Sequence, residues 1–363
     1  MLLVRRVNKV FIMLGSACNL KCSYCVQGKG CSALPTFPDP CIFDFLERAA
    51  KNIAPKQLRI VLYGGEPLIY LKQIKEIVEK THELNVNYSI ITNGRLLDDE
   101  VVEWFNQNNV DVAVSWDGRK SMVTRGYDVV ADKREVLLKV KNLGFSGVLS
   151  GATMLSQMLD DFQSFDDEYH AAHGKHINVN IDELILNGNQ PELLTDIDFA
   201  AVACDMATML DDVMSKKEKP YVKEAYLTRV FESLLNKKSF VGGIGKCRNG
   251  TFTINIDLSG NLYACHNVHE PIGHINGDYA DYYMKLVRGS ETMKYVEVCM
   301  DCPVRDLCRG GCKLVTKEYR ENGFCELRKA LYTPVADFFM QVILPKMKEA
   351  QNNGCNKWHV KCC

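Results

Sequence analysis

The sequence predicts an α/β protein: a curved, barrel-like parallel sheet of six strands with helices around it, followed by a small cysteine-rich domain. Up to about residue 190, short β-branched runs alternate with amphipathic stretches, which is typical of βα units. From about residue 241, glycines, short strands and closely spaced cysteines replace that alternation. We therefore expect four regions, at residues 1–195, 196–240, 241–334 and 335–363.

Six short runs rich in β-branched residues are predicted as strands. They are residues 7–14, 58–63, 87–92, 110–116, 147–154 and 177–186. Apolar residues recur at helical spacing between them, at 68–84 and 96–108. Residues 196–236 are predicted as a helical bridge broken near Pro220, and residues 335–350 as a last helix that is kinked or ends near Pro345.

The composition is that of an ordinary globular protein. Of the 363 residues, 47% are apolar and 25% charged, and the formal net charge is −1. This balance gives no electrostatic reason to expect nucleic acid or an anionic membrane as a partner. No apolar run approaches the roughly 20 residues that span a bilayer, and the N-terminus lacks the order of a signal peptide. We therefore expect a cytoplasmic protein.

Sixteen cysteines need a chemical explanation. A reducing compartment disfavours disulfides, so clustered cysteines favour metal binding over a secreted disulfide framework. Cys18, Cys22 and Cys25 stand at C-x3-C-x2-C spacing directly after the first strand. Three thiolates suit three irons of a 4Fe–4S cubane and leave the fourth iron open, whereas a structural zinc site takes four protein ligands. A zinc knuckle is the alternative.

The distinctive motifs of the first half each follow a predicted strand. In order along the chain they are "CNLKCSYC", "YGGEP" (63–67), "TNG" (92–94) and "SWDG" (115–118). The carboxyl ends of parallel strands converge on one edge of a sheet or barrel, where ligands bind. The four motifs are therefore expected to form one site.

The cysteine spacing, the aromatic residue before the third cysteine and "GGEP" resemble the radical S-adenosylmethionine (SAM) superfamily, whose fold is a partial, TIM-like (β/α)6 barrel. The resemblance implies that Cys18, Cys22 and Cys25 hold the cluster, and that SAM chelates the open iron and is cleaved to methionine and a 5′-deoxyadenosyl radical. It implies SAM contacts at Tyr24, Gly64, Gly65, Glu66, Pro67, Asn93, Ser115, Asp117 and Arg125.

We expect a specific role for five of these predicted SAM contacts, which are Gly64, Gly65, Glu66, Ser115 and Arg125. We expect the two glycines to let the backbone approach SAM and Glu66 to accept from its ammonium group. Ser115 suits a ribose hydroxyl, and Arg125 suits the methionyl carboxylate.

A second set of seven cysteines follows in the C-terminal third: Cys247, Cys265, Cys299, Cys302, Cys308, Cys312 and Cys325. Paired C-x2-C elements alone would equally suit a zinc ribbon. The full order resembles the SPASM extension of peptide-modifying radical SAM enzymes. That resemblance implies one auxiliary cluster on Cys247, Cys265 and Cys312 and another on Cys299, Cys302, Cys308 and Cys325, which makes three 4Fe–4S clusters in all.

Seven cysteines leave one auxiliary iron without a protein thiolate, since two fully ligated cubanes need eight. A further protein residue could fill that position, with His266, Cys355, Cys362 and Cys363 as candidates. A small molecule or water is the second possibility, and a cysteine of the substrate is the third.

Relatives that oxidise a sulfatase cysteine or serine carry an aspartate base directly after the second cysteine of this order. Here His266 stands in that place, and we predict it as a catalytic residue; a purely structural histidine is the alternative. With seventeen residues ahead of Cys18, we expect no precursor-recognition domain before the barrel. Recognition then falls to the barrel, to the auxiliary domain or to a separate protein.

The predicted function is that of a radical SAM enzyme that abstracts hydrogen from a residue of a ribosomally made peptide and forms a cross-link such as a thioether. The substrate is expected to contain cysteine, and an electron donor such as flavodoxin or ferredoxin is implied. Sulfatase maturation is the alternative activity. An alternative of another class is a non-catalytic iron–sulfur or zinc-binding protein, which would not need the "GGEP", "SWDG" and Arg125 set.

Overall fold

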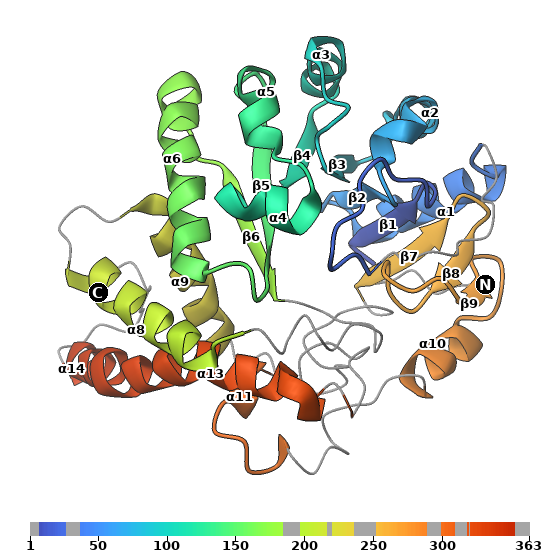
Figure 1. The fold of residues 1–363 in the computed structure, drawn as a ribbon. Helices are drawn as coiled ribbons and strands as arrows, with labels where there is room; N and C mark the ends of the chain where they lie inside the picture. Colours follow the sequence, from blue (N-terminus) through green and yellow to red (C-terminus); the bar gives the residue numbers. More distant parts are fainter. Residues whose placement is uncertain are drawn as a thin grey trace. The chain divides into compact units, whose positions relative to one another are not determined.

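The chain folds into two compact units in the computed structural model (Figure 1). The first unit contains residues 1–116, 121–146 and 247–290, and the second contains residues 117–120, 147–246 and 291–363. The structure describes residues 7–26, 37–183, 197–215, 220–235, 252–288, 299–308, 318 and 320–352.

A parallel sheet forms the centre of the first unit. Strand β1 (Lys9–Met13) pairs in parallel with β2 (Leu58–Tyr63) on one side and with β7 (Thr253–Asp257) on the other. Beyond β2 follow, also in parallel, β3 (Val86–Thr92), β4 (Val110–Ser115) and β5 (Leu143–Leu149). Beyond β7 follow, antiparallel, β8 (Asn261–Tyr263) and β9 (Pro271–His274). The predicted α/β class with a parallel sheet core is confirmed.

Alternation of side chains gives this sheet two different faces. In β1, Val10 and Ile12 are fully buried, whereas Lys9 and Phe11 are only half-buried. β4 shows the same alternation along its whole length, because successive side chains of a strand point to opposite faces. The apolar face lies under the helices (Figure 1). We call the other one the polar face; it carries Lys9, Arg59, Asn87, Asp111 and Asn255.

The helices of the first unit start at recognisable caps. The side chain of Asp39 accepts a hydrogen bond from the backbone of Cys41, and Pro40 takes the first helical position. Asp98 caps the helix that follows β3 in the same way. The helices are α1 (Pro40–Ile53), the 3-10 helix η1 (Pro67–Tyr70), α2 (Leu71–Thr81), α3 (Asp99–Gln107), α4 (Ser121–Arg125), α5 (Val129–Leu137) and α10 (Tyr279–Arg288).

The described part of the second unit is mainly helical and also contains β6 (Asn178–Glu183), which follows β5 in the strand order. Its first helices are η2 (Gly118–Lys120), α6 (Leu155–His173), α8 (Phe199–Ser215) and α9 (Tyr221–Leu235). Its last helices are α11 (Arg305–Cys308), the π-helical η5 (Arg320–Phe324), α13 (Cys325–Phe338), the π-helical η6 (Phe339–Ile343) and α14 (Leu344–Asn352).

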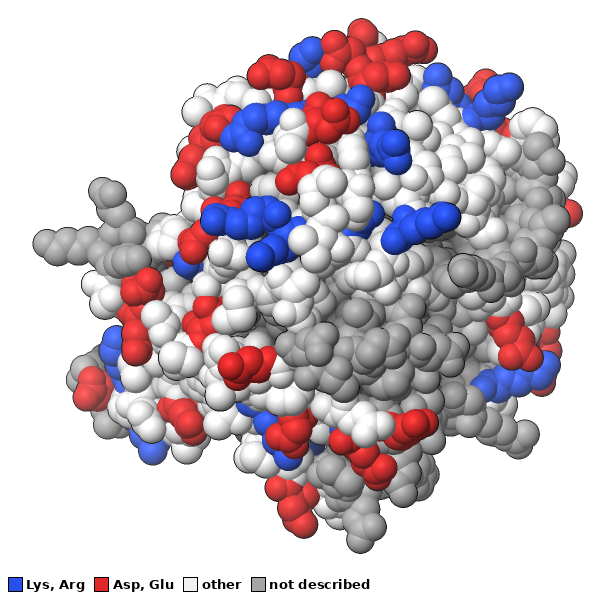
Figure 2. All heavy atoms as spheres, viewed as in Figure 1, with Lys and Arg blue, Asp and Glu red and all other residues white. Residues whose placement is uncertain are grey.

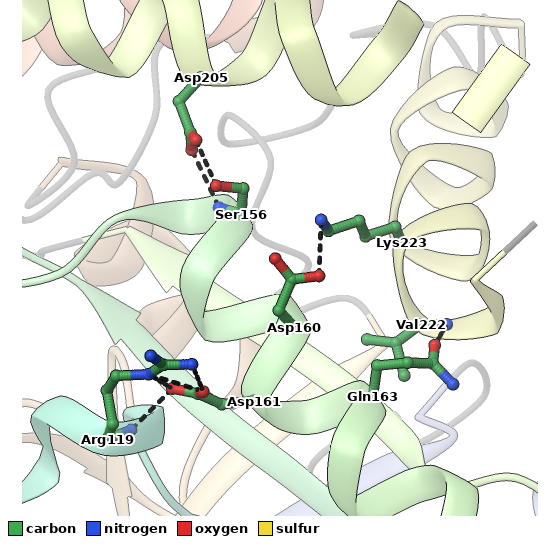
Figure 3. A network of polar contacts seen from close by, with 8 residues as sticks. All are labelled: Arg119, Ser156, Asp160, Asp161, Gln163, Asp205, Val222 and Lys223. Carbon is green, nitrogen blue, oxygen red and sulfur yellow. Dashed lines mark hydrogen bonds and ion pairs between the residues drawn. The ribbon is translucent and has the colours of Figure 1, made fainter. Parts of the chain in front are cut away.

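Polar side chains tie α6 to its neighbours in the second unit (Figure 3). The guanidinium of Arg119 in η2 pairs with Asp161 at 2.6 Å, and Lys223 of α9 pairs with Asp160 at 2.6 Å. Asp205 of α8 accepts from the backbone of Ser156 at 2.9 Å. These contacts hold three separate segments on one long helix.

Two predicted elements differ from the structure. The fifth strand begins at Leu143, four residues before the predicted 147–154, and ends where Thr153 accepts a hydrogen bond from the backbone of Ser150. The chain is helical from Cys325 to Asn352 without a break at Pro345. Pro345 is the second residue of α14 and follows the π-helical η6 directly, where the regular α-helical hydrogen-bond pattern is already interrupted.

The surface seen in Figure 2 mixes charges over the helices of the first unit. Asp and Glu (red) and Lys and Arg (blue) are interspersed over the upper part of this view (Figure 2). No helix in the described ranges is long and apolar enough to cross a bilayer.

Candidate active site and iron–sulfur sites

The loop that follows β1 is joined backbone to backbone to the "GGEP" segment that follows β2. The N–H groups of Gly65 and Glu66 donate to the carbonyls of Gly15 and Ala17 at 2.9 and 2.8 Å. A Cβ added to Gly64 would lie 2.4 Å from the Gly15 oxygen. We expected the glycines to make room for SAM. In the structure they make room for the loop that carries the cysteines.

Glu66 connects the same segment to the end of β3. Its side chain is fully buried and accepts from Thr92 Oγ1 at 2.6 Å, from the N–H of Leu68 at 2.9 Å and from the N–H of Asn93 at 2.8 Å. Three donors occupy most of the positions at which a carboxylate accepts. Burial raises the pKa of Glu66, and these three hydrogen bonds lower it. Glu66 is therefore primarily a residue that joins two loops.

The loop that follows β3 reaches the first cysteine. The amide nitrogen of Asn93 donates to Asn19 Oδ1 at 2.8 Å and lies 3.9 Å from Cys18 Sγ. The guanidinium of Arg95 donates to the Asn19 carbonyl at 3.2 Å. Asn93, predicted to contact SAM, thus also orients the cysteine loop.

Helix α4, which follows β4 in the first unit, holds the other end of that loop. The backbone and hydroxyl of Ser23 donate to the Thr124 carbonyl at 2.9 and 3.1 Å. The Arg125 guanidinium lies 5.4 Å from the centre of the Tyr24 ring, and both side chains are less than 10% exposed. A cation over an aromatic face is attracted by the ring's quadrupole. The structure therefore brings Tyr24 and Arg125 together.

The three thiols of this loop face away from the apolar core. Cys18 and Cys25 are exposed, and Cys22 is half-buried. Partial burial raises the pKa of Cys18, and the nearby Cys25 adds to that effect. Three thiols in one open loop are a donor set that fits a cubane with one iron left for another ligand. Nowhere in the described ranges do three His, Cys, Asp or Glu side chains converge as the ligands of a single metal ion would.

The remaining predicted SAM contacts lie at strand or helix ends. Pro67 is buried at the start of η1. Ser115 is half-buried at the end of β4, in register with Ser146. Asp117, which belongs to the second unit, is buried and accepts from the N–H of Val148 at 2.9 Å. Contact of these residues with SAM stays a prediction.

His266 lies on the polar face of the first unit's sheet. Its ring stacks on Phe11 with 4.4 Å between ring centres and meets Tyr63 edge-on at 4.9 Å. The Tyr63 hydroxyl donates to Asn267 Oδ1 at 2.8 Å. Burial of the ring, helped by the positive charge of Lys9, lowers the pKa of His266 to about 4. The imidazole is therefore neutral at pH 7.

Four predicted cluster ligands meet in the second unit. Cys299, Cys302, Cys308 and Cys325 line one pocket, which we call the four-cysteine pocket. Burial and the charges of the other three thiols raise the pKa of Cys325, which reaches about 11. Four convergent thiols are the ligand set of a fully coordinated cubane. This grouping was implied by resemblance; the four cysteines line one pocket, and their binding of a cluster stays a prediction.

The ligand set of the other predicted auxiliary cluster is described only in part. Cys265 is buried beside His266 in the first unit. Cys247, Cys312 and the tail cysteines Cys355, Cys362 and Cys363 lie outside the described residues.

Some residues around the site carry no sequence motif. Tyr70, in η1, accepts a hydrogen bond from the backbone of Ala17 at 3.0 Å. Asn255 of β7 is 2% exposed and neighbours Phe11 in register, and neither of its amide atoms has a hydrogen-bond partner among the residues that the structure describes. The only signal in the sequence is a polar residue inside an apolar strand, and that strand's position beside β1 is set by the tertiary fold.

Replacing Glu66 with Gln is expected to weaken SAM binding at least tenfold and to destabilise the first unit by about 2–4 kcal/mol. The amide would turn a donor toward the donors from Leu68, Thr92 and Asn93, and a hydrogen bond to a charged group contributes about 1.5–3 kcal/mol. Equilibrium dialysis with SAM and thermal unfolding measure the two effects. Glu79→Gln, on the exposed face of α2, is the matched control, and equal behaviour of both variants would contradict the linking role.

Comparison with known proteins agrees with this arrangement. Residues 12–169 match the model of the radical SAM superfamily. The radical SAM cyclopropyl synthase TigE of Paramaledivibacter caminithermalis is 23% identical, over 90% of this chain and 73% of TigE. A cysteine-type anaerobic sulfatase-maturating enzyme of Clostridium novyi is 22% identical, over 87% of this chain and 92% of that enzyme.

The structure of native anSMEcpe with bound AdoMet and the Cp18Cys peptide superimposes with a TM-score of 0.66. It is 18% identical, and the match covers 95% of this chain and 98% of anSMEcpe. The chain therefore has the fold of radical SAM enzymes with a SPASM-type extension. Residues 12–169 are a radical SAM domain, and enzymes of that superfamily use SAM and a 4Fe–4S cluster.

Proposed function

We propose that this enzyme removes a hydrogen atom from a residue of a ribosomally made peptide and joins the resulting carbon to a cysteine sulfur of that peptide. One observation carries the proposal: the loops after β1, β2 and β3 and helix α4 after β4 are hydrogen-bonded into one assembly around Cys18, Cys22 and Cys25. In this proposal the three cysteines are the ligands of the SAM-binding cluster.

The relatives support a peptide as the substrate class. Two of them are a cyclopropyl synthase and a sulfatase-maturating enzyme, and anSMEcpe was solved with a peptide bound.

The residues of the chain have separate tasks in this proposal. The bound cluster and SAM supply the 5′-deoxyadenosyl radical, and the auxiliary clusters supply a sink for the surplus electron. The segment containing Glu66 and Asn93 fixes the cysteine loop, and Arg125 over Tyr24 marks the edge of the SAM site. Joining carbon to sulfur removes two hydrogens from the peptide, one as an atom and one as a proton plus an electron. His266, a neutral base on the polar face, takes the proton.

We further propose three 4Fe–4S clusters, with the four-cysteine pocket as one site and Cys247, Cys265 and Cys312 as the ligands of another. The open iron of the latter would bind the thiolate of the substrate cysteine, because a soft thiolate suits an iron–sulfur centre and binding lowers the pKa of the thiol. A one-electron donor of the flavodoxin or ferredoxin class and a separate recognition protein complete the proposed partners.

A peptide experiment tests this function. Anaerobically reconstituted enzyme should hold about twelve irons, and a cysteine-containing precursor peptide should perturb an auxiliary-cluster signal and lose two hydrogens together with its free thiol. A Cys→Ser peptide should do neither. If both peptides leave the spectra unchanged and react equally, the thiolate-binding proposal fails.

Sulfatase maturation is the second candidate, because sulfatase-maturating enzymes are among the relatives and share the fold. It predicts an aldehyde in place of the target cysteine, and a hydrazide reagent would capture that aldehyde. Formation of the aldehyde from a sulfatase-derived peptide, without any cross-linked product from precursor peptides, would favour this candidate.

A further inference from the structure

A turn shortly after β8 carries two residues of the proposed mechanism. The carbonyl of Cys265 accepts a hydrogen bond from the N–H of Val268 at 3.1 Å, which closes a turn over residues 265–268. Within this turn the N–H of Asn267 donates to Cys265 Sγ at 3.5 Å. Cys265 is a proposed cluster ligand and His266 is the proposed base. The contacts that place this turn on the sheet therefore also place both of these groups.

Three aromatic rings attach the turn to the polar face of the sheet. The imidazole of His266 stacks on Phe11, with 4.4 Å between ring centres and 10° between ring planes, and meets Tyr63 edge-on at 4.9 Å. Phe11 and Tyr63 also meet edge-on, at 6.3 Å. We call these three rings the ring cluster. Because aromatic pairs are favourable in both stacked and edge-on arrangements, the rings alone do not fix one orientation of the turn.

A directional contact adds to the ring cluster. The Tyr63 hydroxyl donates to Asn267 Oδ1 at 2.8 Å, across 204 residues of sequence. A hydrogen bond weakens steeply when its angle departs from linearity, so this contact restricts the rotation of the turn. Asn267 is bound at both of its ends, because its side chain accepts from Tyr63 while its backbone donates to Cys265 Sγ. The Tyr63 hydroxyl therefore acts on the part of the turn that surrounds the cysteine sulfur.

Tyr63 is itself fixed to the segment that leads into the loop of the SAM-cluster cysteines. Its carbonyl accepts from the N–H of Leu14 at 2.8 Å, and the N–H of Gly65, two residues later, donates to the Gly15 carbonyl at 2.9 Å. These residues and the turn all belong to the first unit. Tyr63 thus contacts the start of the cysteine loop through its backbone and the turn through its side chain.

We propose that Tyr63 is a positioning residue: its hydroxyl, by way of Asn267, holds the imidazole of His266 in one place and orientation relative to the loop of the SAM-cluster cysteines. This rests on the proposed function, which makes His266 the base. Without the hydroxyl the turn keeps its aromatic contacts but loses the hydrogen bond that restricts its rotation. A base must lie within hydrogen-bond reach of the proton that it takes, so rotation of the turn would separate radical formation from modification of the peptide.

Chemical labelling of the full-length, anaerobically reconstituted enzyme tests the positioning directly. Diethyl pyrocarbonate acylates accessible imidazoles, and mass spectrometry of a digest reports the rate at His266, which is half-buried. Tyr63→Phe, which removes only the hydroxyl, should raise that rate about fivefold, the factor that corresponds to the loss of one hydrogen bond. Asn267→Ala should have a similar effect. The double variant should be no faster than either single variant, because both substitutions remove the same interaction.

Tyr88→Phe is the matched control for the loss of a tyrosine hydroxyl. Tyr88 of β3 is a buried tyrosine of the same sheet, and its hydroxyl lies 2.8 Å from Thr81 Oγ1 in α2. The substitution therefore deletes a hydrogen bond of the same kind in the first unit and leaves the Tyr63–Asn267 contact intact. The labelling rate at His266 should stay at the wild-type value.

Three labelling results would overturn the inference. The first is an unchanged rate at His266 in Tyr63→Phe. The second is a pair of effects, of Tyr63→Phe and Asn267→Ala, that add in the double variant, because the two residues would then act independently. The third is an equal rise in Tyr88→Phe, which would indicate a general loosening of the sheet.

The proposed function is assayed separately, as the amount of cross-linked product that a cysteine-containing precursor peptide gives per 5′-deoxyadenosine. Tyr63→Phe should lower this ratio by about the factor by which it raises the labelling rate, and an unchanged ratio would overturn the inference. If the wild-type enzyme forms no cross-link, the proposed function fails, whereas the labelling of His266 still decides whether Tyr63 positions the imidazole.

Discussion

Replacing Cys18, Cys22 and Cys25 together with Ala is expected to abolish reductive cleavage of SAM while leaving the auxiliary iron in place. These are the thiols held by Glu66 and Asn93 at the ends of β2 and β3, and the four-cysteine pocket belongs to the second unit. The iron content should fall by about four, the content of one cubane. Chromatography of 5′-deoxyadenosine after anaerobic incubation with dithionite measures the activity.

Cys41→Ala is the matched control for this triple replacement. Cys41 is a half-buried thiol in α1, and burial together with the neighbouring Asp39 raises its pKa to about 12. It therefore stays protonated and is a poor ligand for iron. The control should keep full cleavage activity and full iron. If the triple variant still produces 5′-deoxyadenosine, the site has been assigned to the wrong cysteines.

The sheet was predictable because its local pattern is strong. β4 alternates buried and half-buried side chains throughout and β1 over its first four residues, and the predicted bounds of β1 to β4 agree with the structure to within two residues at either end. The predicted bounds of β5 were displaced because Gly144, Gly147 and Gly151 interrupt the alternation of side chains by which a strand is recognised. The strand ends in a turn closed by Ser150 and Thr153. Nothing in the sequence near 253–257 indicates that this strand pairs in parallel with β1.

The pairing of β7 with β1 determines which part of the candidate site could be predicted from the sequence. The cysteine spacing and "GGEP" are local motifs, so they were found without knowledge of the fold. The stacking of His266 on Phe11 joins residues 255 positions apart, and it exists because β7 and β8 continue the sheet next to β1. Residues 247–290, which we placed with the cysteine-rich region, accordingly belong to the first unit.

The glycines of "GGEP" are a second case in which the sequence alone could not predict the structural role of a residue. The motif could be recognised in the sequence, but the reason why it needs glycines could not. Gly65 packs against a backbone segment that lies nearly fifty residues earlier in the chain. A sequence pattern reports that a position must lack a side chain. Only the structure reports what occupies that space, which here is the loop of the SAM-cluster cysteines.

Gly65→Ala is therefore expected to inactivate the enzyme although every cysteine is retained. A Cβ at Gly65 would lie 2.4 Å from the Ser16 oxygen and 2.5 Å from the Ala17 oxygen. The Ala17 oxygen cannot move freely, because it accepts from the N–H of Glu66 at 2.8 Å. Overpacking costs about 1–3 kcal/mol, and a shift of about 1 Å in a catalytic group lowers activity on the order of 100-fold. We expect a decrease in 5′-deoxyadenosine formation of at least that size.

The effect should be confined to the SAM-cluster site. Iron content should fall by up to about four, the content of one cubane, while the signal of the four-cysteine pocket in the second unit is retained. Gly273→Ala in β9 is the control, because its Cβ would meet Leu262 and Tyr282 at an ordinary 3.5 Å. Normal SAM cleavage by Gly65→Ala would mean that the two loops separate without cost. The contact between "GGEP" and the cysteine loop would then be incidental, since a contact that positions the cluster cannot absorb two backbone clashes unchanged.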